Sequence, residues 1–242
     1  MIPTGDVVQD FSDAFSAAFG LLAGFDQALL EIVWLSLNVS TGAVLIAALI
    51  GLPLGAFLAV QRFPGSGIIV ALINALMGLP PVVAGLVIYM LLSRAGPLGA
   101  LGLLYTPSAM VIAQAILVTP IIAAISHQVL RDLNKEYDAY LRSLGASRRA
   151  RIATLLWDGR YSLVSALLAG FGRASAEVGA IMIVGGNIDH VTRMMTTAIA
   201  LETSKGNLEL ALALGIVLVS ISLAINGAIL VIRNRAERRQ YA

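Results

Sequence analysis

Cysteine is absent from the 242 residues of this chain, and no Lys or Arg occurs before Arg62. Without cysteine, the chain has no disulfide, thiolate metal site or cysteine nucleophile. Without an early basic residue, the N-terminus lacks the positively charged start of a secretory signal peptide. The phosphate loop of nucleotide-binding proteins ends in Gly-Lys, whereas neither Lys135 nor Lys205 follows a glycine. We therefore expect no cofactor, no catalytic residue and no phosphate-loop nucleotide site in this chain.

Charge is also scarce, at 12% of the residues, whereas 58% are hydrophobic. The mean hydropathy is +0.88, and an ordinary soluble domain carries about 25% charged residues. This composition predicts an integral membrane protein surrounded by the lipid bilayer. The pI of 9.1 is then explained by basic residues at the membrane surface, and no nucleic-acid partner is expected.

Five apolar stretches are each long enough to cross a membrane, which takes about 20 residues of helix. Their continuous runs favour helices over the strands of a barrel, which alternate in segments of about ten residues. The stretches leave no room for a soluble domain, so residues 1–242 are predicted to form one all-α polytopic membrane domain. The five stretches are residues 32–60, 68–92, 107–130, 161–184 and 210–232.

The 16 basic residues are shared unequally between the two sides of the predicted bundle. One set of alternate loops holds 12 of them, seven of which lie between Arg131 and Arg160, and the other set holds three, with Arg173 inside the fourth stretch. Cytoplasmic loops are enriched in Lys and Arg. We therefore expect a multi-pass cell-membrane protein with its N-terminus outside and its C-terminus in the cytoplasm.

Residues 1–31 form the external N-terminal segment and carry five acidic residues but no basic one. Phenylalanine and leucine recur from Phe11 to Leu29 at spacings of three and four, which is the pattern of an amphipathic helix. Such a helix can lie on the outer membrane interface or pack against the bundle, and the sequence leaves both open.

Residues 131–160 form the predicted cytoplasmic loop, whose most charged part is EYDAYLRSLGASRRARIATLLWD, residues 136–158. Helical spacing runs over Lys135–Leu144. Gly145 can take the left-handed conformation that ends a helix, and Ser147 can cap the next one. We expect a short helix, a tight turn and a second helix leading into the fourth apolar stretch. This exposed corner suits docking into a soluble partner, although an ordinary amphipathic loop would fit as well.

Two apolar stretches contain residues that membrane helices rarely hold. Pro80 and Pro81 remove backbone donors, and irregular backbone at membrane depth lines a watery cavity or is buried in protein. The prolines therefore mark either a transport pathway or a kink between packed helices. In the fourth stretch, Arg173 costs about 2.5–3.5 kcal/mol on insertion scales, and Glu177 lies on the same helix face four residues on. This pair either braces the helix or lends positive potential to an anion path.

Residues 185–207 are too polar to cross the membrane, and the apolar residues between Met194 and Leu201 predict a short helix on the outer face. That segment could form an outer gate, meet a binding protein, or be a surface hairpin. His127 and His190 belong to no pattern of carboxylates, so no metal site is expected. Hydroxyl and amide groups can bind a polar or anionic solute without carrying full charge. The candidates to line such a path, besides the two prolines, are Asn38, Ser40, Thr41, Asn74, Thr119, Asn187 and Thr197.

The corner Leu-Gly-Ala-Ser, residues 144–147, resembles the coupling loop of ABC importer membrane subunits. In that family the loop inserts into the ATPase subunit and carries its motion to the membrane helices. The family's Glu-Ala-Ala corresponds here to residues 139–141, with Asp138 just before them, and its Leu-Pro is replaced by Trp157 and Asp158. The residues to which the resemblance assigns ATPase coupling are Asp138, Ala139, Leu144, Gly145, Ala146 and Ser147.

Two further stretches resemble oxyanion permeases of this class. Leu-Pro-Pro-Val-Val, residues 79–83, followed by Gly-Pro-Leu-Gly, residues 96–99, is similar to the second helix of molybdate and tungstate permeases. Arg-x-x-x-Glu-x-Gly, from Arg173, is followed by Gly-Gly-Asn-Ile and a Thr-rich segment, which is similar to the same branch. Residues 176–215 look closest to tungstate permeases.

The resemblance implies the type I ABC importer permease fold and the import of an oxyanion, foremost tungstate, by alternating access. It implies a second copy of the chain as a partner, two cytoplasmic ABC ATPase subunits that bind ATP and Mg²⁺, and an extracytoplasmic oxyanion-binding protein. Molybdate or sulfate as the substrate stays open. So do a passive channel or ion-coupled carrier, which would need no docking loop, and an intramembrane enzyme, for which Arg173 and Glu177 are the only ionisable pair.

Overall fold

The computed structural model describes residues 15–61 and 63–240, and every regular element in that part of the chain is helical. Three of its helices are long and apolar enough to cross a membrane. They are α2 (Gln27–Val60), α5 (Pro107–Ser143) and α10 (Leu208–Gln240).

Two pairs of shorter helices pass the same test only when each pair is taken together. Helix α3 (Ser66–Met77) meets α4 (Pro81–Leu92) at 99°, and α7 (Arg160–Ser175) meets α8 (Gly179–Gly185) at 61°. If each bent pair is one crossing, the total is the five crossings predicted from the sequence. The second stretch is interrupted at Pro80 and Pro81, where the sequence indicated irregular backbone, whereas the expectation that the fourth stretch is one continuous helix is wrong.

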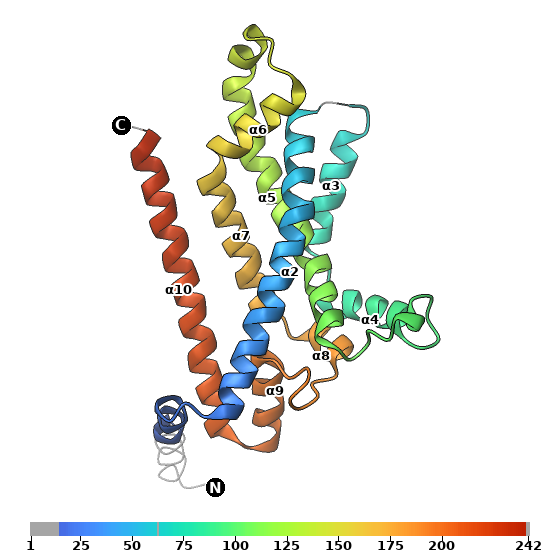
Figure 1. The fold of residues 1–242 in the computed structure, drawn as a ribbon, viewed down its shortest axis with the longest axis vertical. Helices are drawn as coiled ribbons and strands as arrows, with labels where there is room; N and C mark the ends of the chain where they lie inside the picture. The colour runs from blue at the N-terminus through green and yellow to red at the C-terminus, as the bar shows by residue number, and fades with distance from the viewer. Residues whose placement is uncertain (1–14, 62, 241–242) are drawn as a thin grey trace, which may run out of the picture.

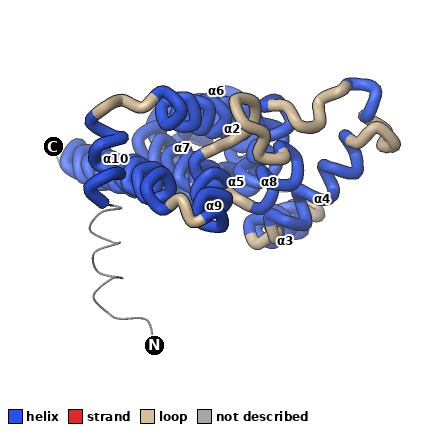
Figure 2. Tube along the Cα trace, turned by 90° about the horizontal axis from the view of Figure 1, so that it is seen from below, coloured by secondary structure: helices blue, strands red, loops and turns tan. Residues whose placement is uncertain are grey.

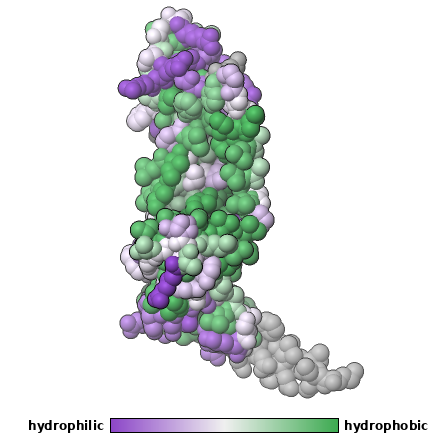
Figure 3. All heavy atoms as spheres, turned by 90° about the vertical axis from the view of Figure 1, so that its right-hand side faces the viewer, coloured by the Kyte–Doolittle hydropathy of each residue, from purple (hydrophilic) through white to green (hydrophobic). Residues whose placement is uncertain are grey.

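Helices α2, α5 and α10 run along the long axis of the molecule with α3 and α7 beside them, whereas α4 lies across that axis, and shorter helices cover the two ends (Figure 1). Helix α6 (Arg148–Asp158) lies at one end and α9 (Met195–Lys205) at the other. Seen from the α9 end, α10 lies at one edge and α3 and α4 lie at the opposite edge (Figure 2). An apolar belt separates the two polar ends on the face shown in Figure 3. This distribution is the one expected of a protein that spans a bilayer.

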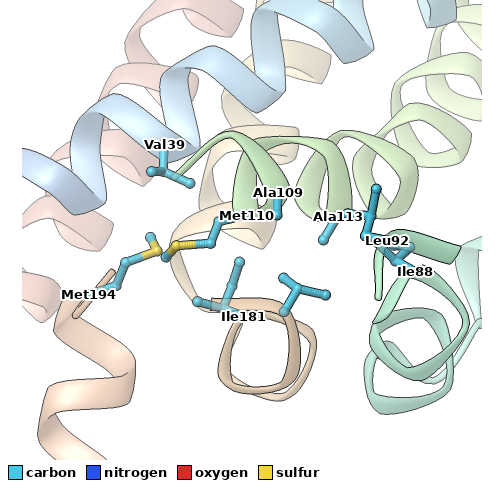
Figure 4. Packing of buried hydrophobic residues seen from close by; sticks show 9 residues of the cluster. Val39, Ile88, Leu92, Ala109, Met110, Ala113, Ile181 and Met194 are labelled. Atoms are coloured by element: carbon cyan, nitrogen blue, oxygen red, sulfur yellow. The ribbon is translucent and has the colours of Figure 1, made fainter. Parts of the chain in front are cut away.

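Small residues let α2 and α5 pack closely along their length. A Cβ atom added at Gly55 would lie 2.7 Å from the carbonyl oxygen of Ala123, so only glycine fits there. Near the α9 end, nine buried side chains from α2, α4, α5, α8 and the segment before α9 form one cluster. In that cluster Met110 and Met194 point toward each other (Figure 4). The core thus joins segments from all parts of the chain.

The helix boundaries depart from the prediction at two places. Helix α2 begins five residues earlier than expected, because the Asp26 carboxylate accepts a hydrogen bond from the Leu29 N–H at 2.9 Å and caps it. Helix α5 continues without a break to Ser143, so the expected separate short helix is its last part. Before α2, residues 15–23 form a helix. Phe11 and the rest of residues 1–14 lie outside the described residues, and the interfacial position of this segment stays a prediction.

Candidate functional site

The α5–α6 hairpin, residues 136–158, turns at Gly145, whose φ is +64°. The Ala146 N–H donates to the Leu141 carbonyl and the Gly145 N–H donates to the Arg142 carbonyl, each at 3.0 Å. This pair of bonds is the glycine-terminated helix end that the sequence predicts. The Ser147 hydroxyl then accepts from the Ala150 N–H at 3.3 Å and caps α6, also as predicted.

Ion pairs hold the two arms of the hairpin together. Asp138 on α5 pairs with Arg142 at 2.9 Å on the same helix and with Arg151 on α6. Arg151 also donates to the side-chain oxygen of Asn134 at 3.0 Å. Desolvation alone would raise the pKa of the Asp138 carboxyl, but the hydrogen bonds and charges of Arg142 and Arg151 outweigh it and lower this pKa. The carboxylate is therefore ionised at neutral pH, and the arms stay clamped.

The outer surface of the hairpin exposes large side chains that such a short element cannot bury by itself. Tyr140 is 67% exposed, Leu144 is 62% exposed and Trp157 is 68% exposed. Ala139, Gly145 and Ser147 are exposed as well, and Ala146 is half-buried. The predicted coupling residues thus lie together at the tip, except Asp138, which faces the inside of the hairpin. Arg160 stacks over the Trp157 ring at 4.6 Å.

The base of the hairpin is packed into the membrane bundle. Leu155 of α6 is fully buried in one cluster with Ala56 and Ala59 of α2, Leu130 of α5 and Leu163 of α7. A force on the tip would therefore reach three crossing helices through one packed contact.

The break between α7 and α8 is held together by Glu177, which is 4% exposed. One carboxylate oxygen pairs with the Arg173 guanidinium at 2.6 Å, and the other accepts from the Ala180 N–H at 3.1 Å and caps α8. The Glu177 carbonyl accepts from the Thr196 hydroxyl at 2.8 Å, which ties the break to α9. The Arg173–Glu177 contact expected from spacing is present, but the two residues lie on either side of a bend rather than on one straight helix.

The break between α3 and α4 lies beside that bend. Pro80 and Pro81 stand at the first positions of α4, where a missing N–H costs nothing. A Cβ atom at Gly85 of α4 would lie 2.7 Å from the Cα atom of Ala180 in α8. Helices α4 and α8, the second helices of the two interrupted crossings, therefore pack against each other.

The fold does not gather the other predicted pathway residues into one site. Asn38 and Thr41 lie on an exposed face of α2, whereas the Ser40 hydroxyl is buried and makes no hydrogen bond to any residue in the described ranges. Thr119 donates to its own helix at the Ala115 carbonyl. Asn74 lines a hollow of about 480 Å³ between α3 and α5.

Only Asn187 and Thr197 are brought together among these candidates. The Asn187 side chain donates to the Thr197 carbonyl at 3.3 Å, and its own amide oxygen is buried and has no hydrogen-bond partner in the described part of the chain. Thr197 is fully buried, and its hydroxyl accepts from the Met194 N–H at 3.1 Å. This contact fixes the start of α9, the short helix predicted in the external segment.

Sequence reasoning missed several residues that hold these elements. Gln114 of α5 is fully buried and donates to the Ala174 carbonyl at 2.9 Å; its signal was an amide inside an apolar stretch. His190 contacts Glu31 at 2.8 Å, although 159 residues separate them, and no local pattern reveals that pair. Within the described ranges, no group of three or more His, Cys, Asp or Glu side chains is placed to hold a metal ion.

Comparison with known proteins gives consistent matches over nearly the whole chain. A protein family described as "binding-protein-dependent transport system inner membrane component" matches residues 51–238. The tungstate uptake system permease protein TupB of Peptoclostridium acidaminophilum is 41% identical, over 90% of this chain and 96% of that protein. The TupB protein of Campylobacter jejuni is 36% identical, over 88% and 90%. A probable anion ABC transporter permease protein of Haloferax volcanii is 39% identical, over 82% and 88%.

Proposed function

Because this chain belongs to the family of binding-protein-dependent transport system inner membrane components, we propose that it imports an oxyanion, tungstate in particular. As a permease it is a multi-pass membrane transport component of the type I ABC importer fold, and its relatives are transport components rather than enzymes. The partners and the direction of transport that follow are parts of the same proposal.

The observation that carries this function is the clamped, exposed α5–α6 hairpin. A glycine-ended turn, a helix capped by Ser147 and the Asp138–Arg151 ion pair give the tip a fixed shape. A fixed tip with exposed Tyr140 and Leu144 suits a groove on an ATPase subunit. ATP and Mg²⁺ bind to two such ATPase subunits, and this chain supplies no nucleotide site.

Two copies of the chain form the pathway, because about five crossings are few to enclose a route for a hydrated anion. An extracytoplasmic binding protein delivers the oxyanion to the α9 end. The α6 end faces the cytoplasm, since most of the basic residues lie there and cytoplasmic loops are enriched in Lys and Arg. The N-terminus is then outside and the C-terminus inside.

The mechanism is alternating access driven from the hairpin. Closure of the ATPase subunits on ATP displaces the two tips, and the buried contact around Leu155 passes this displacement to α2, α5 and α7. The bends at Pro80 and Glu177 meet at the α4–α8 contact, so movement of α7 reaches α4 there. In this mechanism the hairpin biases two arrangements of one packed bundle.

Tungstate is favoured over molybdate and sulfate because two of the relatives compared above are named for tungstate uptake. The exposed polar residues Asn38, Thr41 and Asn74 are the weakest candidates to line the pathway. A channel or an ion-coupled carrier is the competing class, and neither would need the exposed tip.

Reconstitution with the ATPase subunits and the binding protein tests this function. Tungstate should raise ATP hydrolysis at a lower concentration than molybdate, and sulfate should raise it only weakly. Stimulation by sulfate or by an amino acid, with tungstate inactive, would contradict the substrate. Transport that continues without ATP after residues 136–150 are deleted would favour the channel or carrier.

A further inference from the structure

A second candidate site lies inside the α5–α6 hairpin rather than at its tip. A hollow of about 360 Å³ opens between the end of α2 and the facing sides of α5 and α6. Four of the residues that line it are basic and one is acidic, so its walls carry a formal charge of +3. The lining residues are Val60, Gln61, Asn134, Lys135, Asp138, Arg142, Arg148 and Arg151.

Arg151 is held by two neighbouring side chains, and its Nε–H donor takes part in neither contact. Its side chain is 13% exposed, and one terminal nitrogen bonds both Asn134 and Asp138. Its Nε–H group is buried and meets no acceptor among the residues that the structure describes. Arg151 also lines the hollow, so the positive charge of its guanidinium contributes to the potential that an anion there would meet.

Arg148 is a further basic residue that lines the hollow. It is exposed, and it forms no ion pair within the part of the chain that the structure describes. Asp138 is already shared between Arg142 and Arg151, and Lys135 pairs with Asp132 at 2.9 Å. The hollow therefore attracts an anion even though one carboxylate lines it.

The depth of the hollow indicates where that anion comes from. Val60 ends the apolar helix α2, and Gln61 follows it at the wall of the hollow. The polar end that carries α6 begins directly beyond the apolar belt (Figures 1 and 3). The hollow is thus at the level of lipid headgroups, on the side assigned to the cytoplasm, where basic pockets between membrane helices bind anionic lipids.

We propose that this hollow binds a phosphate group, and that the phosphate belongs to the headgroup of an anionic phospholipid of the cytoplasmic leaflet. Guanidinium groups bind phosphate through paired, charge-assisted hydrogen bonds. The bound headgroup bridges α5 and α6 beside the end of α2. It thereby stabilises the base of the hairpin independently of the substrate carried.

Arg148→Gln and Arg149→Gln form a matched pair for the test. Both remove one exposed positive charge from the same turn of α6, but only Arg148 lines the hollow. The full chain, purified in detergent, is titrated with dioctanoyl phosphatidylglycerol, with dioctanoyl phosphatidylcholine and with inorganic phosphate, and bound ligand is counted by native mass spectrometry. Unchanged melting temperatures of both variants show that they are folded.

Wild-type protein should bind phosphatidylglycerol saturably and more tightly than phosphatidylcholine. Arg148→Gln should weaken that binding about tenfold, whereas Arg149→Gln should change it less than about twofold. Equal weakening by both variants, or no preference for the anionic lipid, overturns the proposal. If inorganic phosphate displaces the lipid at a similar concentration, the phosphate site stands, but its lipid source is overturned.

Discussion

Replacing Glu177 with alanine removes the carboxylate that holds the α7–α8 break together. The change eliminates the ion pair with Arg173 at 2.6 Å and the bond from the Ala180 N–H at 3.1 Å. Each hydrogen bond to a charged group contributes about 1.5–3 kcal/mol, and Arg173 is 35% exposed, so water partly compensates it. We expect a loss of about 3 kcal/mol in the free energy of unfolding, and about half of that for Glu177→Gln, which can still cap α8.

Unfolding of the purified protein by a titrated denaturing detergent, followed by circular dichroism, measures both losses. Glu209→Gln is the matched control, because Glu209 is an exposed carboxylate in the first turn of α10 and its replacement should change stability by less than about 0.5 kcal/mol. Arg173→Ala combined with Glu177→Ala should cost less than the two single changes added together, since the variants share one interaction. If Glu177→Ala unfolds at the same detergent fraction as the control, the bracing role is refuted.

Three further changes test other parts of the structure. Gly145→Ala should lower the free energy of unfolding by about 1–2 kcal/mol, because φ is +64° there. It should also reduce substrate-stimulated ATP hydrolysis. The control Gly172→Ala, inside α7 with open space around it, should leave hydrolysis unchanged. Gly85→Ala should lower stability by about 1–3 kcal/mol, because the new Cβ atom would lie 2.7 Å from the Cα atom of Ala180; a melting temperature equal to that of wild type would argue against the α4–α8 contact. The hydrogen bond to Glu31, together with the charges of Glu31 and Asp189, raises the pKa of His190 above its ordinary 6.5, so this contact stabilises the fold fully below pH 6.5 and is lost as pH rises through the raised value. The stability difference between wild type and His190→Gln should therefore shrink as pH rises above about 6.5, and a difference independent of pH would contradict the contact.

Local signals allowed the hairpin to be predicted closely from the sequence. Gly145 and Ser147 determine the turn through bonds that reach only three to five residues along the chain. The capping residue Asp26 was an equally local signal, yet hydropathy alone placed the start of α2 too late. The number of crossings also followed from hydropathy, because it depends on segment length alone.

The bends of the second and fourth crossings depend on distant contacts and could not be predicted in the same way. Pro80 and Pro81 indicated an irregular backbone, but the 99° bend between α3 and α4 depends on α4 packing against α8. At the second bend no proline occurs, and the break is stabilised by Thr196 from α9 and Gln114 from α5. A single hydroxyl or amide side chain in the sequence does not indicate which distant residue it will contact. The sequence therefore could not show that most of the predicted pathway residues lie apart in the fold.

Crosslinking at the tip of the hairpin tests the central claim most directly. Because the chain contains no cysteine, Ala146→Cys creates a single attachment point on the α5–α6 hairpin, and Ala95→Cys, in the exposed loop after α4, serves as the control. In membranes that contain the whole transporter, the first variant should crosslink to the ATPase subunit, with a yield that changes when ATP is added, and the second should not. Failure of the Ala146 position to capture a nucleotide-hydrolysing subunit would contradict the claim that this hairpin drives transport.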